Sequence, residues 1–282
     1  MSGDHEPREY LAGAVRALRA DPELRTQLVG DPQLISAALA GLPEPVRSRA
    51  TVVGASQVVS MQDKPREAIR HKKQSSMRVA VDLVQAGTAL GANTKATPEQ
   101  LRQFAAMGAI IARDVYGVAN PRIGLLNIGE EDMKGHELVQ AAQALLARSG
   151  LNYVGFVEGD DIFSGDVDVV VTDGFTGNVA LKTMEGVAGL IADRLRQEFR
   201  ASWLDRLAGA VAAPVLRRAA AGLDPRRYNG ACMVGLDGIV VKSHGRADGV
   251  AFARAIGTAA LAVRHALTAH IAQAMRAQGS TT

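Results

Sequence analysis

The stretch VVVTDGFTGNVALK, from Val169 to Lys182, places β-branched residues before an acid, a Gly-Phe-Thr-Gly turn and the start of a helical pattern. Runs of Val that end in Asp and Gly are typical of buried strands. A strand, a short loop and a helix in this order are typical of parallel α/β proteins. The loop carries more polar groups than a helix cap needs, so it is also a candidate binding loop.

The same order recurs along the chain, where short runs rich in Val and Ile alternate with amphipathic segments. We predict strands within residues 24–31, 50–56, 122–129, 152–159, 167–174 and 237–245. We predict helices within residues 10–20, 75–86, 98–116, 132–149, 178–199 and 250–277, the third of them opened by a Thr97–Gln100 capping box. This alternation predicts a single α/β domain over residues 1–282, with a mostly parallel sheet covered by helices on both faces.

The composition of the 282-residue chain narrows the class of protein further. Apolar residues make up 47% and the formal net charge is only +3, which favours a packed globular protein and does not indicate a nucleic-acid partner. Cys232 is the single cysteine, so no internal disulfide can form. Uncharged apolar runs of about 18 residues and a signal-peptide pattern are both missing, so we expect a soluble, cytoplasmic protein.

Six loops in this strand–helix order combine glycine with acidic, amide or imidazole side chains. Ligands of parallel sheets bind at the carboxyl ends of the strands, and glycine lets the backbone approach an anion closely. Each loop alone is ordinary turn chemistry, but together they predict a site for an anion such as phosphate. The sequence has neither a P-loop nor a dinucleotide-binding glycine fingerprint. The candidate residues are Gly3, Asp4, His5, Asn93, Glu130, Glu131, Lys134, Asp173, Gly174, Thr176, Gly177, Asn178, Lys182 and His244.

The motifs NIGEE (residues 127–131) and DGFTGN (residues 173–178) resemble those of the PlsX phosphate acyltransferases of bacterial phospholipid synthesis. The opening MSGDHEP and the later YNGACMVGLDGIVVKSHG (residues 228–245) extend the resemblance over nearly the whole chain. It implies a fold of the phosphotransacetylase and isopropylmalate-dehydrogenase type, usually a homodimer, without a cofactor. It also implies transfer of a fatty acyl group from acyl-[acyl carrier protein] to inorganic phosphate. The acyl phosphate formed would then serve a glycerol-3-phosphate acyltransferase.

The chain departs from this family at two places where the strand–helix order also lapses. Family members carry a strand before the Gly-Asp-His loop and a segment of several tens of residues between the positions of Gly87 and Gly91. We therefore expect further residues before residue 1 and between residues 87 and 91. A measured mass near 29.6 kDa would refute this expectation.

The implied reaction needs phosphate held against a thioester carbonyl, donors for the tetrahedral oxyanion, and an acid for the departing thiol. Residues 173–178 would form part of the phosphate cradle, with Thr176 and Asn178 as donors and Lys182 as a nearby charge. His5 and His244 are candidate proton donors. The alternatives are a helix cap with a surface lysine, and loop histidines bonded to the backbone.

The remaining polar residues carry weaker indications. Glu130, Glu131 and Lys134 would orient the substrate or form a capping group at the surface. Asp160 and Asp161 resemble a metal-binding pair only superficially, because no His or Cys lies near them in the sequence, so we expect no metal. We expect Cys232 to be a packed thiol.

Two surface patterns indicate partners. Lys64, Arg70, Lys72 and Lys73 form a basic run that would attract an acidic carrier protein or simply face solvent. Residues 200–230 form a projecting helical segment with flanking arginines, which fits a peripheral contact with the inner face of the membrane or a dimer contact about equally well. The family resemblance favours the membrane. Its apolar stripe comprises Trp203, Leu207, Val211 and Val215.

Other functions remain open at this point. A phosphotransacylase that uses acyl-CoA would share the fold and the anion site, and a scaffold for lipid-synthesis enzymes would bind carrier protein without releasing thiol. A decarboxylating dehydrogenase would need an aspartate cluster and a nucleotide site, neither of which the sequence shows.

Overall fold

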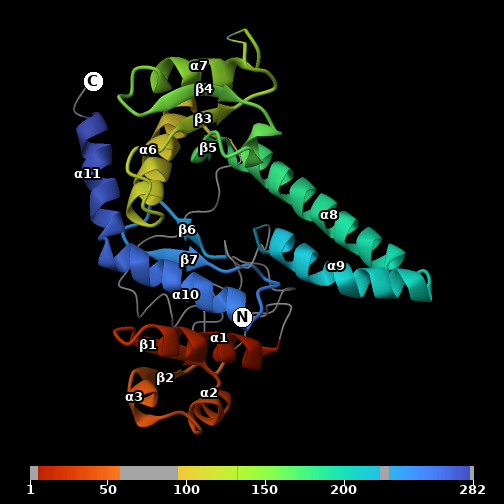
Figure 1. Cartoon of the computed structure of the whole chain (residues 1–282). Coiled ribbons are helices and arrows are strands. Elements are labelled where there is room, and N and C mark those ends of the chain that lie inside the picture. Colours follow the sequence, from red (N-terminus) through yellow and green to blue (C-terminus); the bar gives the residue numbers. More distant parts are fainter. Residues whose placement is uncertain (1–5, 58–94, 132, 223–228, 280–282) are drawn as a thin grey trace. The chain divides into compact units, whose positions relative to one another are not determined.

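A computed structural model describes residues 6–57, 95–131, 133–222 and 229–279 of the chain. The chain divides into two compact units (Figure 1). The first unit comprises Met1–Leu90 and Pro225–Ala269, and the second comprises Gly91–Asp224 and His270–Thr282. The predicted helix at 75–86 and the junction at 87–91 lie outside the described residues.

The second unit is built on three parallel strands in the order β4-β3-β5, namely β3 (Ile123–Leu126), β4 (Tyr153–Val157) and β5 (Val169–Val171). Helices α6 (Pro98–Asp114) and α7 (Glu137–Leu146) pack against each other and against these strands. Burial of large aliphatic side chains forms the core, including Leu101, Ile123, Leu125, Leu146 and Val171. Gly108 lets α6 approach β5 closely, because a Cβ there would lie 2.7 Å from Val169 Cγ1.

The rest of the second unit is helical. A short 3₁₀ turn, η1 (Asp161–Phe163), follows β4, and α8 (Gly174–Glu198) follows β5 directly. Helix α9 (Trp203–Gly222) comes after a short turn and contains Pro214. Helix α11 (Leu267–Gly279) begins in the first unit and ends in the second, where His270 Nδ1 lies 2.7 Å from Asp114 Oδ2 of α6.

The first unit combines the two ends of the chain. Parallel strands β1 (Thr26–Gly30) and β2 (Ala50–Gly54) lie with helices α1 (Pro7–Ala20), α2 (Pro32–Leu39) and α3 (Glu44–Arg47). The antiparallel pair β6 (Ala231–Met233) and β7 (Val240–Lys242) precedes α10 (Gly249–Arg264). Helices α1 and α10 touch backbone to backbone, since a Cβ on Gly13 would lie 2.7 Å from the Gly249 carbonyl oxygen.

The α/β class and the parallel pairing that the sequence predicts are confirmed, and all six predicted strands are present. Three details of the predicted helices were wrong. The helix predicted at 250–277 breaks into α10 and α11 at Ala266, whose φ is +48°. Helix α8 begins at Gly174 rather than at residue 178, and α7 begins at Glu137 rather than at residue 132. Strand β6 and helices α2 and α3 were missed. The capping box of Thr97 and Gln100 is confirmed.

Among the described residues, no single helix is both long and apolar enough to cross a membrane. The pair α10 and α11, bent by 57°, passes that test only on its length and composition.

Arg49 stabilises the end of α1. Its Nη2 donates to the Leu18 carbonyl oxygen (2.6 Å), and its Nη1 donates to the carbonyl oxygens of Asp21 (2.6 Å) and Leu24 (3.1 Å). Its Nε donates to the Pro45 carbonyl oxygen (2.8 Å). The last carbonyls of a helix lack partners within the helix, so this side chain satisfies groups that α1 leaves open.

We expect Arg49→Leu to lower the free energy of unfolding by about 2–4 kcal/mol, because it leaves several half-buried carbonyls without their charged donor. Urea denaturation measures this change. Arg47→Leu is the matched control: Arg47 pairs with Glu44 of the same short helix at the surface, and the loss of this pair should cost less than about 1 kcal/mol. An equal loss of unfolding free energy in the two variants would contradict the role of Arg49.

Candidate functional site

The carboxyl ends of β3, β4 and β5 meet at one edge of the second unit's sheet, because the three strands are parallel (Figure 1). Three polar loops leave this edge, namely residues 127–136, 158–168 and 172–173 with the first turn of α8. Ligands of parallel sheets bind at such an edge. The structure therefore brings together the predicted residues of NIGEE and DGFTGN.

The loop after β3 is organised around Asn127, whose side chain is only 8% exposed. Asn127 Nδ2 donates to the carbonyl oxygens of Gly129 (3.0 Å) and Lys134 (3.2 Å). Gly135 adopts a φ of +86°, and a Cβ there would lie 2.3 Å from Asn127 Oδ1. This loop can therefore close over the asparagine only with glycine at position 135.

The charged side chains that the structure describes in this loop face solvent. Glu130, Glu131 and Lys134 are exposed. Lys134 Nζ lies 3.9 Å from Glu131 Oε1, a loose ion pair that leaves the ammonium able to contact an anion. Lys134 is the cation that the loop presents at the sheet edge.

Asp173 is the N-cap of α8, and its carboxylate accepts most of the hydrogen bonds that the first turn of the helix can donate. Its carboxylate accepts the backbone N–H groups of Phe175 (2.9 Å) and Thr176 (3.0 Å) and the Thr176 hydroxyl (2.5 Å). Burial alone would raise the pKa of Asp173, but these hydrogen bonds from Thr176 and Phe175 lower its pKa below the usual value. Because the Thr176 hydroxyl donates to Asp173, it presents lone pairs rather than a proton to a ligand. Its predicted role as a donor stays a prediction.

Asn178 and Lys182 extend from the exposed side of α8. Lys182 stands eight residues after Gly174, about 12 Å along the helix axis, and its Nζ lies 2.8 Å from Glu185 Oε2. Both members of this pair are well exposed, so the pair is weak and can rearrange around an anion. Gly174 and Gly177 lie in the first turn of α8, where Gly177 N–H donates to the Asp173 carbonyl oxygen.

His244 lies in the first unit, in the loop after β7. Arg246 N–H donates to His244 Nδ1 (3.1 Å), so the neutral ring carries its proton on Nε2. The backbone N–H of His244 donates to Asn229 Oδ1 (2.8 Å). Asn229 is buried, and its Nδ2 donates to Ser243 Oγ and the Ala251 carbonyl oxygen, both at 2.8 Å. Sequence reasoning missed Asn229, although its position in the YNG segment just before β6 was a usable signal.

Some predicted residues lie outside the described part of the chain: Gly3, Asp4, His5, Asn93, Lys64, Arg70, Lys72 and Lys73.

Within the described residues no group of three or more His, Cys, Asp or Glu could hold a metal ion. Asp161 instead accepts the Glu158 N–H at 2.8 Å and shapes the loop after β4. Burial raises the pKa of the Cys232 thiol, which makes this side chain a poor nucleophile.

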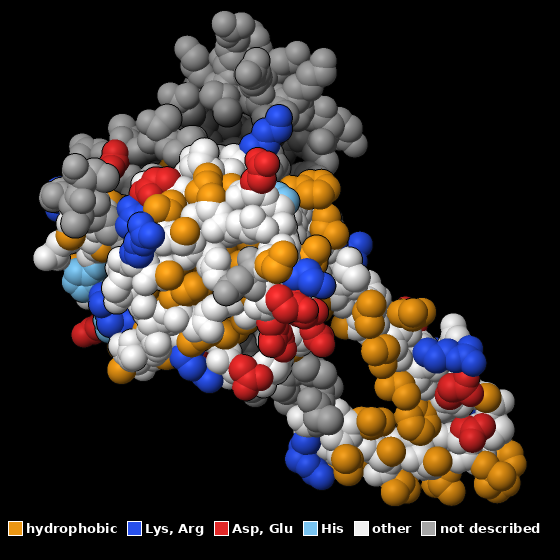
Figure 2. All heavy atoms as spheres, turned by 90° about the horizontal axis from the view of Figure 1, so that it is seen from above, with side chains coloured by type: hydrophobic (Ala, Val, Ile, Leu, Met, Phe, Trp, Pro, Cys, Tyr) orange, Lys and Arg blue, Asp and Glu red, His pale blue; other side chains and the backbone are white. Residues whose placement is uncertain are grey.

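Helices α8 and α9 form a hairpin that exposes apolar side chains along its length (Figure 2). No residue of α8 is buried. On α9 the exposed fractions are 73% for Trp203, 60% for Leu207, 74% for Val211 and 57% for Val215. Patches of this kind mark interaction surfaces. The predicted apolar stripe is thus present as an uncovered surface.

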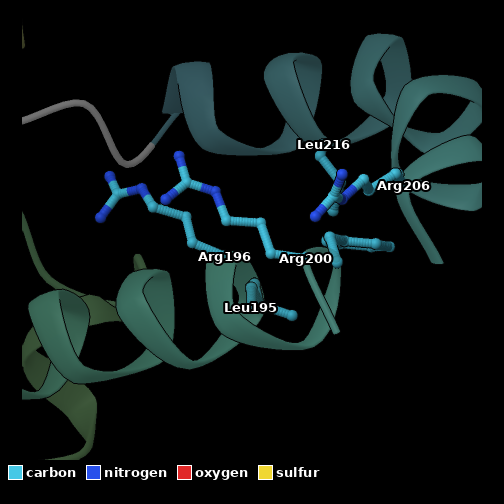
Figure 3. A pocket seen from close by; sticks show the side chains of 7 residues that line it. Leu195, Arg196, Arg200, Arg206 and Leu216 are labelled. Atoms are coloured by element: carbon cyan, nitrogen blue, oxygen red, sulfur yellow. The ribbon is translucent and has the colours of Figure 1, made fainter. Parts of the chain in front are cut away.

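A cleft of about 350 Å³ lies between the two helices of this hairpin (Figure 3). Arg196 and Arg200 extend side by side from one helix, and leucine side chains of both helices also line the cleft (Figure 3). Arg196 also pairs with Asp193. The lining residues are Leu195, Arg196, Phe199, Arg200, Arg206, Gly209 and Leu216.

Comparison with known proteins agrees with this picture. The family model described as "Fatty acid synthesis protein" matches residues 1–90 and 88–270. A phosphate acyltransferase of Methylococcus capsulatus is 43% identical over 321 aligned residues, covering 98% of this chain and 95% of that protein. Phosphate acyltransferases of Alkalilimnicola ehrlichii and Pseudomonas putida are 45% and 41% identical, covering 94% and 95% of this chain and 91% and 93% of theirs.

The parallel α/β unit, its polar sheet edge and these similarities define an acyltransferase enzyme of lipid biosynthesis. The chain belongs to the PlsX family of phosphate acyltransferases.

Proposed function

We propose that the protein transfers a fatty acyl group from acyl-[acyl carrier protein] to inorganic phosphate. The acyl phosphate formed would feed a glycerol-3-phosphate acyltransferase. The observation that carries the proposal is the meeting of the NIGEE and DGFTGN loops at one edge of a parallel sheet, in a chain 43% identical to a phosphate acyltransferase. Anions bind at such edges, where glycine-rich loops and helix N-termini present N–H groups.

The chemistry needs little activation of the nucleophile. A phosphate oxygen attacks the thioester carbonyl carbon, the tetrahedral oxyanion collapses, and the C–S bond breaks as the new C–O bond is retained. The proton that phosphate brings ends on the departing thiolate, so free thiol and acyl phosphate are the products. The enzyme must therefore position two substrates and stabilise the oxyanion, which together lower the barrier by several kcal/mol.

The described residues support a division of these tasks. Lys134 and Lys182 are exposed cations that follow the two motifs closely in the sequence and would attract phosphate, with Glu130 orienting it. Asn178 would donate a hydrogen bond from the exposed side of α8. His244, in the first unit, carries a proton on Nε2 in its neutral form, and its role as a proton donor stays a prediction.

The hairpin of α8 and α9 supports a peripheral contact with the inner face of the membrane. Its exposed stripe would enter the interface, and the arginines of its cleft would face anionic headgroups. Delivery of an acyl phosphate, which is amphiphilic, would benefit from such a contact. A homodimer formed through part of the same hairpin remains the second proposal for this surface.

Release of free thiol from palmitoyl-[acyl carrier protein], with and without phosphate, tests the proposed reaction. We expect release that depends on phosphate and is much slower with palmitoyl-CoA. A preference for palmitoyl-CoA would instead identify a phosphotransacylase that uses acyl-CoA. Binding of carrier protein without any thiol release would identify a scaffold and refute the proposal.

A further inference from the structure

Two side-chain amides to which the proposed reaction gives no role hold the loop after β3. Asn127 Nδ2 donates to the carbonyl oxygens of Gly129 and Lys134, as described above. From the other side, Gln140 Nε2 in the first turns of α7 donates to the carbonyl oxygens of Met133 (3.2 Å) and Gly135 (3.3 Å). Four carbonyls of one short loop thus depend on two amides.

Among the described residues of this loop, a backbone hydrogen bond runs from Lys134 N–H to the Glu131 carbonyl oxygen (2.9 Å). Its two large apolar side chains in the described part of the chain point outward: Ile128 is 79% exposed and Met133 is 89% exposed. These two side chains therefore do not hold the loop, and the amides hold the backbone from which Glu130 and Lys134 extend.

Asn127 is also an unusual residue to bury. In the described part of the chain, Asn127 and Asn229 are the two polar or charged residues that are buried. Burial of an amide contributes less to stability than an apolar side chain of similar size would. Asn229 fixes the loop that carries His244, and Asn127 fixes the loop that carries Lys134. Both buried amides thus serve loops with candidate site residues.

We propose that Asn127 and Gln140 are positioning residues, which hold Lys134 and Glu130 at the sheet edge for contact with phosphate. This inference rests on the proposed function of that edge. Loss of either amide would free carbonyls of the loop and let Lys134 move, which weakens phosphate binding while the acyl substrate is still bound.

Gln140 offers the cleaner test, because its side chain is exposed and its loss should not unfold the protein. Gln140→Ala removes the two donated bonds. Gln140→Glu keeps the shape, places a carboxylate against the carbonyls of Met133 and Gly135, and is compatible with the N-terminal turns of a helix. We expect the KM for phosphate to rise about 10-fold in Gln140→Ala and more in Gln140→Glu. We expect kcat and the KM for acyl-[acyl carrier protein] to change less, and Tm to stay near that of the parent.

Asn127→Asp removes the buried donors with almost no change in size, and we expect kcat/KM for phosphate to fall about 100-fold. Asn152→Asp is the control: Asn152 Nδ2 donates to the Asn120 carbonyl oxygen (3.2 Å), next to the amino end of β4, away from the proposed site. It should retain the parental kinetics.

A KM for phosphate that stays at the parental value in both Gln140 variants would overturn the inference and leave the proposed function standing. A parent enzyme without phosphate-dependent thiol release would refute the proposed function, and this role with it. A common fall in Tm and in both KM values would indicate a merely structural role and would also overturn the inference.

Discussion

Phosphate-dependent thiol release is expected to fall about 100-fold in Lys182→Ala and by a similar factor in Asn178→Ala. Lys182 supplies a charge and Asn178 a donor on the exposed side of α8, beyond the first turn that Asp173 already caps. Groups aimed at developing negative charge contribute more to the transition state than to substrate binding. We therefore expect kcat to fall more than the KM for phosphate rises. Steady-state assays with palmitoyl-[acyl carrier protein] measure both.

Arg194→Ala is the matched control for Lys182→Ala. Arg194 lies on the same helix, pairs with Glu198 at 2.9 Å and is exposed, so its removal changes the net charge of α8 equally. It should retain nearly full activity. If Arg194→Ala and Lys182→Ala behave alike, α8 contributes only general charge, and the assignment of Lys182 is wrong.

Association with liposomes that contain anionic lipid is expected to fall at least 10-fold in the double variant Trp203→Asp, Leu207→Asp. Burial of an aromatic or leucine side chain is worth about 1.5–3 kcal/mol, and the new carboxylates would repel anionic headgroups. Both side chains are well exposed and lie on one stripe of α9, so the variant should fold. Co-sedimentation with vesicles, together with circular dichroism, measures both effects.

The double variant Gln197→Asp, Ser202→Asp separates the loss of apolar surface from the gain of charge. Both positions are exposed and polar. Asp at position 202 can still accept the Asp205 N–H that Ser202 caps, but it loses the hydrogen bond that the Ser202 hydroxyl donates to Asp205 Oδ2 (2.6 Å). We expect this control to associate more strongly than the Trp203, Leu207 variant. If the apolar variant still binds liposomes but runs as a monomer where the parent is a dimer, the stripe is a dimer contact instead.

Much of the fold could be predicted from local sequence signals. The run Val169–Val171 before Asp173 is a strand followed by a capped helix, and Thr97 with Gln100 opens α6. Other elements had signals that were overlooked. Asp31 and Pro32 are an N-cap and a first helical residue, and they open α2 with two hydrogen bonds from backbone N–H groups.

The break between α10 and α11 had no such signal. Ala266 adopts a positive φ, which costs energy for a residue other than glycine, and neither Gly nor Pro marks the place. Tertiary packing therefore overrides the local preference there. The meeting of the polar loops at one sheet edge was predictable, because parallel strands end at the same edge, and the roles of Glu130, Lys134 and Asp173 there stay predictions. The hydrogen bonds of Asn127, Gln140 and Asn229 were not predictable, although Asn127 and Asn229 stand in motifs that the sequence showed, because their partners become neighbours only after the chain has folded.

The backbone contact between Gly13 of α1 and Gly249 of α10 also constrains the order in which the protein can form during translation. Gly249 follows Gly13 by more than 200 residues, so the first unit closes only after Gly249 has left the ribosome. The described strands of the second unit are all synthesised by Val171 and can pair well before then. Nascent chains would thus carry the paired strands of the second unit while α1 still lacks α10, and chaperones would have to shield the face of α1 that α10 later covers.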